Sequence, residues 1–499
     1  MKCPEILFFL FTISVAAQKP NILFILTDDQ APHTLSTYGN KVCYTPNIDR
    51  LASSGIVLDR AYHMGSMSGA VCSPSRTMIM SGRTLWHLPA RGKKHLKKEE
   101  GKASGADILN NTIPAVFNRA GYETFRTCKN GNSYGLANAL FQIVKDKSCR
   151  NADEENGSQW HGRQVLNFLN ERSSRKEKKP FMIHFGFSHP HDARTGRADL
   201  LKKYGAVNCV DPPSQINPKS PRLPASWLPE HPFHHGHPGL RDEERVPGVK
   251  TSRSEATVRN ELGREYACIE NIDEQVGLIM KKLKDIGELE NTFVIFTADH
   301  GIAVGRHGLM GKQNLYEHSW RVPFIASGPG IRAGTRAPGN AYLLDVLPTI
   351  CDLAGIEIPD TVQGKSLQPV LTGERKFVRE VVYGAYCGGT KPGMRSVRKG
   401  DWKLIKYDLL EGEVRETQLF NLNQNPQELL IQHHHADLIS KTGNKPGRNQ
   451  VNLAEHSVHT KKLREMEALL LSEMIRLKDP YRFWDQPQKE RKKTGAGHR

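Results

Sequence analysis

Two stretches of the chain are apolar at almost every position. Residues 21–27 and 292–298 each form a short hydrophobic run without alternation, which is typical of strands buried on both faces of a parallel sheet. The first run ends in Asp28 and Asp29, and the second ends in Asp299. Because ligands of open α/β sheets bind beyond the carboxyl ends of the strands, we expect these carboxylates to share one edge of the sheet.

Helical periodicity alternates with these strands. The helical stretches are 112–120, 258–283 and 343–353, and further strands are expected at 122–127 and 322–326. Thr45 and Pro46 are typical of an N-cap and a first helical position. The alternation predicts an α/β fold in which helices cover a parallel sheet.

The pattern changes after residue 378. Short alternating strands follow at 381–385, 394–398, 402–407 and 417–421, and a helix is expected at 461–477. We therefore expect four parts: a signal peptide at 1–17, a catalytic domain at 18–378, a C-terminal subdomain at 379–485 and a basic tail at 486–499. Residues 190–256 are rich in Pro, His and Arg and show little periodicity, which is typical of a functional or disordered loop.

The first 17 residues are typical of a secretory signal peptide. Lys2 precedes an apolar run at 6–15 that is too short to span a bilayer, and small residues follow it. A buried first strand is the alternative, but residues 21–27 already supply that strand. We expect a secreted or periplasmic protein without a membrane span, whose eight remaining cysteines form no disulfide framework.

Composition limits the class of protein and of partner. The 499 residues are 38% apolar and 25% charged, which excludes a disordered, collagen-like or coiled-coil chain. The net charge of +17 favours an anionic partner, and nucleic acid, acidic lipid and sulfated or uronic polysaccharide all fit it. Basic residues cluster at 91–102, 172–179 and 489–499, although such runs are also typical of solvated loops and frayed tails.

Several side chains are candidates for chemistry. Asp28, Asp29 and Asp299 would repel one another at one sheet edge unless a cation lies among them, and oxygen ligands favour calcium or magnesium. An isolated Asp-Asp pair after a strand would otherwise be a turn or helix cap. The histidines at 231, 234, 235, 237 and 433–435 lack helical spacing, so we expect solvated loops there rather than zinc sites.

Cys72 lies in a Gly- and Ser-rich turn, four residues before Arg76 and just before an expected helix. A lone cysteine is usually a small buried hydrophobe. Here a helix N-terminus and an arginine together make an anion site, which favours a nucleophile that faces an anionic substrate.

The segment Cys72-Ser-Pro-Ser-Arg76 resembles the site that is oxidised to formylglycine in sulfatases of the alkaline phosphatase superfamily. Further segments resemble the family in the same order, at 21–29, 45–55, 297–301, 308–323 and 400–404. The resemblance covers about residues 20–430. It implies a large mixed, mostly parallel sheet sandwiched by helices, with a smaller C-terminal antiparallel sheet plus helix.

The resemblance also implies a set of roles. Cys72 would be converted to 3-oxoalanine (formylglycine) by a formylglycine-generating or sulfatase-maturing enzyme, and one hydroxyl of its hydrate would attack sulfur. A calcium ion would be held by Asp28, Asp29, Cys72, Asp299 and His300. The other catalytic residues would be Arg76, which holds the hydrate, Lys129, Lys312 on a sulfate oxygen, and His191 as the acid for the leaving alcohol.

The chain departs from the family pattern at two positions. Position 131 is Gly where the family usually has a histidine that serves as the base for elimination of sulfate, so another group must take that role or the local alignment shifts. His300 stands where some members have Asn, and nitrogen is a less usual calcium ligand.

We therefore expect a sulfuric ester hydrolase that cleaves sulfate monoesters of a sulfated polysaccharide or its oligosaccharides, without nucleic acid as a partner. An aryl sulfatase for small substrates and a phosphodiester or phosphonate monoester hydrolase on the same fold are alternatives. An exported polyanion-binding protein with an unmodified Cys72 is a third.

Overall fold

The computed structural model describes residues 18–89, 104–234, 242–388 and 390–488. The predicted signal peptide, the basic segment at 91–102, His235, His237 and the chain from residue 489 lie outside these residues. Among the helices that are described, none combines the length and the apolar character that crossing a bilayer requires.

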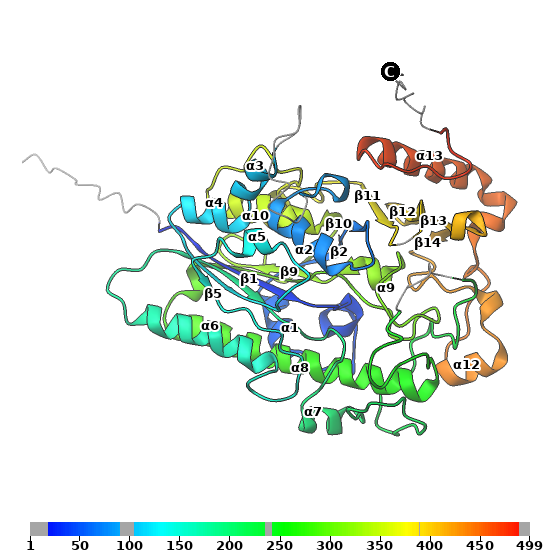
Figure 1. Ribbon diagram of the computed structural model, residues 1–499, viewed down its shortest axis with the longest axis horizontal. Coiled ribbons are helices and arrows are strands. Elements are labelled where there is room, and N and C mark those ends of the chain that lie inside the picture. Colours follow the sequence, from blue (N-terminus) through cyan, green and yellow to red (C-terminus); the bar gives the residue numbers. More distant parts are fainter. Residues whose placement is uncertain (1–17, 90–103, 235–241, 389, 489–499) are drawn as a thin grey trace, which may run out of the picture.

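A nine-stranded mixed sheet forms the centre of the molecule (Figure 1). Its order is β10-β2-β9-β7-β1-β6-β4-β5, and β8 also pairs with β2. The strands are β1 (Asn21–Thr27), β2 (Gly55–Tyr62), β4 (Glu123–Thr127), β5 (Ile143–Val144), β6 (Phe181–Gly186), β7 (Thr292–Ala298), β8 (Arg321–Val322), β9 (Phe324–Ser327) and β10 (Thr335–Tyr342). β7, β1, β6, β4 and β5 run parallel, and β9 runs antiparallel to β7 and β2. The predicted mixed, mostly parallel sheet is thus confirmed.

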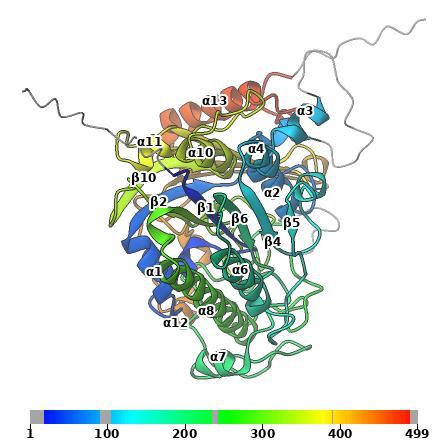
Figure 2. The same ribbon diagram turned by 90° about the vertical axis from the view of Figure 1, so that its left-hand side faces the viewer.

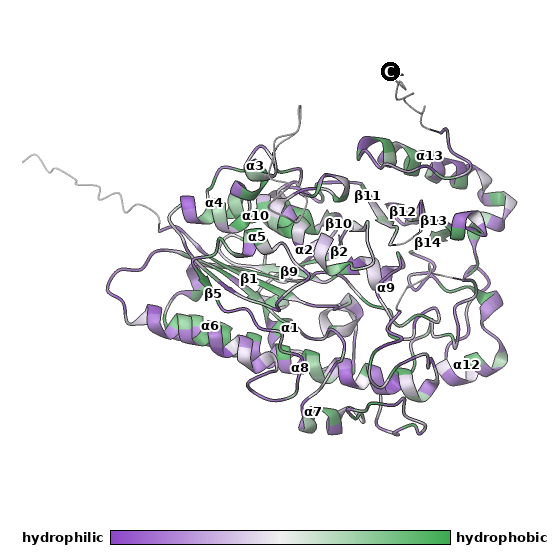
Figure 3. Ribbon diagram, viewed as in Figure 1, coloured by the Kyte–Doolittle hydropathy of each residue, from purple (hydrophilic) through white to green (hydrophobic). Residues whose placement is uncertain are grey.

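Helices cover both faces of this sheet (Figures 1 and 2). One face carries α1 (Pro46–Ser53), α6 (Ser158–Ser173) and α8 (Glu255–Asp285), and the other carries α2 (Cys72–Ser81), α4 (Ile113–Arg119) and α10 (Val346–Leu353). The shorter helices are α3 (Gly105–Asn110), α5 (Gly135–Asn138), α7 (Ala198–Lys203), α9 (Glu317–Trp320), α11 (Gln368–Leu371) and α12 (Ala436–Thr442). Figure 3 shows green, hydrophobic strands between helices on which purple and green alternate.

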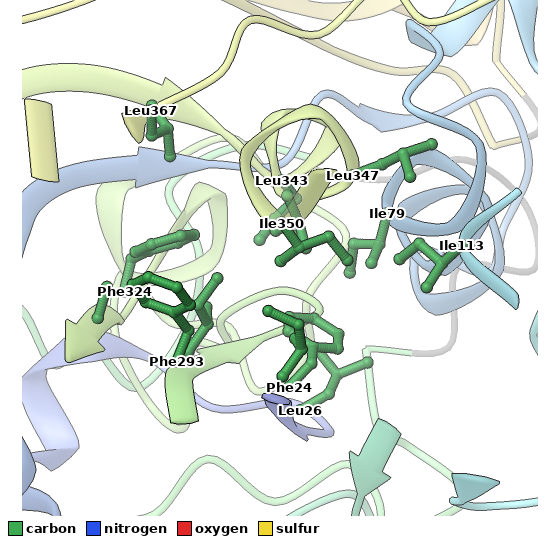
Figure 4. Packing of buried hydrophobic residues seen from close by; sticks show 14 of the residues in the cluster. Phe24, Leu26, Ile79, Ile113, Phe293, Phe324, Leu343, Leu347, Ile350 and Leu367 are labelled. Carbon is green, nitrogen blue, oxygen red and sulfur yellow. The ribbon is translucent and has the colours of Figure 1, made fainter. Parts of the chain in front are cut away.

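The alternation of side chains along β1 explains why the strand must be apolar throughout. Phe24 and Leu26 point into the core beneath α2 and α10, where Ile79 and Ile350 meet them (Figure 4). Leu23 and Ile25 point the other way, into the core beneath α6 and α8. Because successive side chains of a strand face opposite sides, a strand covered on both faces needs hydrophobic residues at every position.

A second, five-stranded sheet follows in the order β14-β13-β12-β11-β3. Its strands are β11 (Val381–Tyr386), β12 (Gly393–Lys399), β13 (Trp402–Leu409), β14 (Val414–Asn421) and the short β3 (Gly65–Ser66), and α13 (Thr460–Arg476) packs against it (Figure 1). The four C-terminal strands are antiparallel, as predicted. The sequence did not predict that β3, from the N-terminal region, pairs in parallel with β11.

Thr45 is the N-cap and Pro46 the first residue of α1, as predicted, although the Thr45 hydroxyl makes no capping hydrogen bond and lies 3.0 Å from Ser36 Oγ. Two local expectations were wrong. The Pro- and His-rich segment at 190–256 is not wholly irregular, since it contains α7 and the first residues of α8. His434 is not a solvated loop residue: it is 7% exposed, and its ring nitrogens lie 2.9 and 3.3 Å from the carbonyl oxygens of Leu430 and Ala225.

Candidate functional site

The carboxyl ends of four neighbouring strands converge at one edge of the large sheet. In the order β7, β1, β6 and β4, they lead to Asp299, Asp28, His191 and Lys129. The register pairs Thr27 with Ala298, so the two aspartates follow the strands side by side. The predicted meeting of Asp28 and Asp299 at one sheet edge is therefore confirmed, and it lies where α/β sheets usually bind ligands.

The backbone of the Asp28-Asp29 turn helps to hold the aspartates together. The amide of Asp29 donates to Asp299 Oδ1 at 3.2 Å, and the amide of His300 donates to the same oxygen at 3.0 Å. Asp29 has a φ of 67°, a left-handed conformation that non-glycine residues rarely adopt. Such conformations persist where the surroundings impose them, and they cluster at functional sites.

Cys72 is the first residue of α2 and lies among the carboxylates. The ligand atoms of Asp28, Cys72, Asp299 and His300 all lie within 4.8 Å of one another, and so do those of Asp28, Asp29, Cys72 and His191. All six residues are buried. Two imidazoles therefore flank the sulfur, and His300 Nε2 lies 3.2 Å from it.

Arg76, one turn of α2 beyond Cys72, bridges the two strands. Its Nε lies 2.8 Å from Asp299 Oδ2 and its Nη2 lies 3.1 Å from Asp28 Oδ1. Its Nη1 lies 2.9 Å from the sulfur of Cys128, a contact that the sequence did not predict. The guanidinium thus joins α2 to the ends of β1, β7 and β4.

Two lysines neutralise the aspartates of the turn. Lys129 Nζ forms an ion pair with Asp28 Oδ2, and Lys312 Nζ lies 2.8 and 2.6 Å from the two oxygens of Asp29. Burial alone would raise the pKa of both carboxyl groups. Lys129 and Arg76 instead hold the pKa of Asp28 well below its usual value, and His191, Lys312 and His300 lower that of Asp29 to about 2.

The charges also shift the acidity of the two residues that meet at the sulfur. Burial would raise the pKa of the Cys72 thiol, but Lys129, Lys312 and His300 lower it well below the ordinary value. Burial would likewise lower the pKa of His300, but Asp299, Asp29 and Cys72 raise it to about 9. The site therefore strongly favours negative charge at the position of the sulfur.

His191 is held by its neighbour in the chain. Its Nδ1 forms an ion pair with the carboxylate of Asp192 and lies 2.8 Å from the carbonyl oxygen of the same residue. Although burial opposes protonation, Asp29, Asp28 and Asp192 raise the pKa of His191 to about 10. The neighbouring carboxylates thus favour the protonated form of the ring.

The donor set suits a divalent cation. The side-chain oxygens of Asp28 are enclosed and accept no hydrogen bond within the described structure, although they face cations. Carboxylates of Asp28, Asp29 and Asp299 supply the hard oxygen ligands that calcium prefers, and His300 adds a nitrogen. These residues therefore fit the calcium ion that the sequence resemblance implied.

Some features of the site were missed or stayed open. Asp192 was missed although it directly follows His191, and its adjacency was a usable signal. Gly131 and Asn132 are both exposed, unlike the buried residues around Cys72. The other predicted histidine clusters join no metal-like group among the residues that the structure describes, and all eight described cysteines are free thiols.

Comparison with known proteins identifies the family. Residues 20–356 match the Sulfatase family model, and residues 305–443 match that of the N-sulphoglucosamine sulphohydrolase C-terminal region. The chain is 25% identical to an N-acetylglucosamine-6-O-sulfatase of Bacteroides thetaiotaomicron, over 83% of this chain and 82% of that enzyme. It is 26% identical to a Delta 4,5-hexuronate-2-O-sulfatase of the same species, over 94% of this chain and 91% of that enzyme.

A solved structure in complex with its substrate, D-glucosamine-2-N,6-O-disulfate, shares the fold. It covers 93% of this chain and 99% of its own, with a TM-score of 0.66 and 22% identity. Because the family model spans most of the chain, from β1 through α2 to beyond Asp299, this protein belongs to the sulfatase family of the alkaline phosphatase superfamily and is a sulfuric ester hydrolase.

Proposed function

We propose that this sulfatase removes sulfate from a sulfated polysaccharide or its oligosaccharides, with formylglycine made from Cys72 and with a bound calcium ion. The observation that carries the proposal is the position of Cys72 at the start of α2, within 4.8 Å of the ligand atoms of Asp28, Asp299 and His300. Relatives that are named for sulfatase activity on amino sugars and hexuronates support the choice of substrate.

The residues around Cys72 would have different roles in the reaction. When present, formylglycine would supply the oxygen nucleophile for sulfur, and calcium held by Asp28, Asp29, Asp299 and His300 would supply positive charge for the sulfate oxygens. Lys129 and Lys312 lie on either side of the aspartates, where they bind and orient an anionic ester. Arg76 keeps α2 in register with the aspartates through its contacts with Asp28 and Asp299.

His191 holds the proton that the leaving oxygen requires. Asp192 fixes Nδ1, so that Nε2 remains for the leaving oxygen. A sugar alkoxide is a poor leaving group, and a positioned acid contributes about 10²–10⁴-fold in such reactions. The other imidazole near Cys72, that of His300, contacts the sulfur directly.

The remaining proposals concern organisation and location. We propose a signal peptide at 1–17, a catalytic domain at 18–378, a C-terminal subdomain at 379–485, a basic tail at 486–499 and a secreted or periplasmic protein. The net charge of +17 supports a polyanionic substrate. A formylglycine-generating or sulfatase-maturing enzyme would be the partner that modifies Cys72.

Intact-mass analysis tests the proposal most directly. Conversion of the thiol to an aldehyde lowers the mass of the protein by about 18 Da, and the shift must map to the peptide that contains Cys72. Cys72→Ala should abolish hydrolysis of both aryl and sugar sulfates while the circular dichroism spectrum is retained. An unmodified Cys72 in active protein would refute the role of formylglycine. Faster turnover of phosphodiesters or phosphonate monoesters than of sulfates would favour the alternative hydrolase.

A further inference from the structure

Arg150 lies on the leaving-group side of the site, although no sequence motif pointed to it. It belongs to the segment between β5 and α6, next to the fully buried Cys149. The backbone amide of Cys149 donates to Ser188 Oγ at 3.1 Å, which fastens this segment to the turn that follows β6. The same turn carries His191, so the fold brings Arg150 beside the proposed acid.

Arg150 and His191 contact the same atom, the backbone carbonyl oxygen of Asp192. Arg150 Nη1 donates to the backbone carbonyl oxygen of Asp192 at 3.1 Å, and His191 Nδ1 lies 2.8 Å from the same oxygen. The guanidinium and the imidazole of His191 therefore share this carbonyl oxygen as a neighbour. Lys129 and Lys312, in contrast, lie on the aspartates that surround Cys72.

No carboxylate among the described residues pairs with Arg150. The buried arginines nearby have carboxylate partners: Arg76 has two aspartates, and Arg194 binds Glu243 and Glu261 at 2.7 and 3.0 Å. Within the described residues, Arg150 makes no ion pair, and its enclosed Nε has no hydrogen-bond partner. A guanidinium that is partly withdrawn from water without a counter-charge is costly, and an anionic ligand would relieve that cost.

We propose that Arg150 binds a second anionic group of the substrate, next to the ester that is cleaved. The sugar must lie against His191 when its oxygen receives the proton, and Arg150, a neighbour of His191, is a cation without a carboxylate partner among the described residues. Both a carboxylate and a second sulfate offer the paired oxygens that a guanidinium binds with two hydrogen bonds. Arg150 would thus make the enzyme prefer doubly anionic sugars. This inference rests on the proposed function, because it needs a sugar sulfate in the site.

The test compares substrates that differ in one charged group. We would measure kcat/KM on a monosulfated hexosamine, on the same sugar with a second sulfate, and on a monosulfated disaccharide with a neighbouring uronate. In Arg150→Gln, the preference for the doubly anionic substrates should fall about 10- to 100-fold, mainly through KM, because a hydrogen-bonded charge is lost. Arg150→Lys should retain part of the preference, since the charge remains but the paired geometry does not.

Arg163→Gln is the matched control, because Arg163 is an exposed arginine of the neighbouring α6 that pairs with Glu155. It should leave the preference as in the wild type. If only the disulfated or only the uronate substrate responds to Arg150→Gln, that result identifies which anion is bound. An equal loss on all three substrates in Arg150→Gln would overturn the proposal, since the residue would then act only by positioning His191. If the wild type hydrolyses none of the three sugars, the proposed function fails instead.

Discussion

Lys312 and Asp29 form a buried ion pair in which the ammonium nitrogen contacts both carboxylate oxygens, at 2.8 and 2.6 Å. The lysine comes from the segment after β7 and the aspartate from the end of β1. A lysine that was expected to touch sulfate thus contacts a proposed calcium ligand. Together with Lys129 and Arg76, it balances the aspartates with cations of the chain itself.

This balance predicts how the protein responds to metal removal. Chelation should abolish hydrolysis, and calcium should restore it, because Asp28 groups with Asp299 and with Asp29 around Cys72 at one sheet edge. The fold should survive, since cations of the protein still neutralise the aspartates. Activity and circular dichroism measured before and after dialysis against a chelator check both statements. Full activity in protein that elemental analysis shows to be free of metal would contradict the calcium proposal.

The role of His191 can be separated from that of His189. His191→Ala should slow the hydrolysis of sugar sulfates by roughly 10²–10⁴-fold, and that of nitrophenyl sulfate much less, because nitrophenolate leaves without a proton. His189→Ala is the control: burial lowers the pKa of His189 to about 4, so it holds no proton at neutral pH. Equal losses on both substrates in His191→Ala would show that the residue binds rather than protonates.

The net charge of +17 predicts a difference between polymeric and small substrates. Raising the salt should slow the hydrolysis of a sulfated polysaccharide more steeply than that of an aryl sulfate. The Debye length falls from about 10 Å at 0.1 M to about 3 Å at 1 M, so long-range attraction is lost while contacts in the site persist. Parallel slopes of kcat/KM against ionic strength would indicate that the charge does not steer the polymer.

Glu265, in α8, should make the stability of the fold fall as the pH rises. Its side chain is 0% exposed, both oxygens lack a hydrogen bond in the described structure, and burial raises its pKa from 4.5 to about 7. The unfolded chain ionises first, so this carboxyl destabilises the fold increasingly as pH rises from about 4.5 to 7, and by a constant amount above that.

Glu265→Gln should therefore raise the free energy of unfolding at pH 8 by up to about 3 kcal/mol, from roughly 1.4 kcal/mol per pKa unit, and by little near pH 4.5. Denaturant unfolding at both pH values measures the difference. Glu290→Gln, at an exposed position, should show none. A stability change that is the same at the two pH values would mean that packing, not ionisation, dominates at Glu265.

The sequence predicted the ends of the central strands better than the details around them. β1 and β7 have the bounds that the apolar runs predicted, because strands buried on both faces need hydrophobic residues throughout. Because β1 and β7 are parallel neighbours, their carboxyl ends bring Asp28 and Asp299 side by side, as predicted. The contact of Arg76 with Cys128 and the position of Arg150 could not be predicted, because each depends on how loops fold after strands that are distant in sequence.

His434 shows a different limit. Three consecutive histidines in a polar segment are typical of solvent, yet the middle one is enclosed against the carbonyl oxygens of Leu430 and Ala225. Sequence polarity does not reveal a partner that tertiary folding supplies from two hundred residues away.

The pairing of β3 with β11 affects the order in which the protein folds during synthesis. Gly65 and Ser66, just ahead of the Cys72 helix, complete a sheet whose other strands begin at Val381. We expect the segment before Cys72 to stay unanchored during synthesis until β11 has been made, because pairing between distant strands forms late. We expect a thiol reagent to label Cys72 in nascent chains that end before β11, and longer chains to become protected. The thiol of Cys72 is 1% exposed in the finished fold, so a modifying enzyme would have access to it only before translation of the chain is complete.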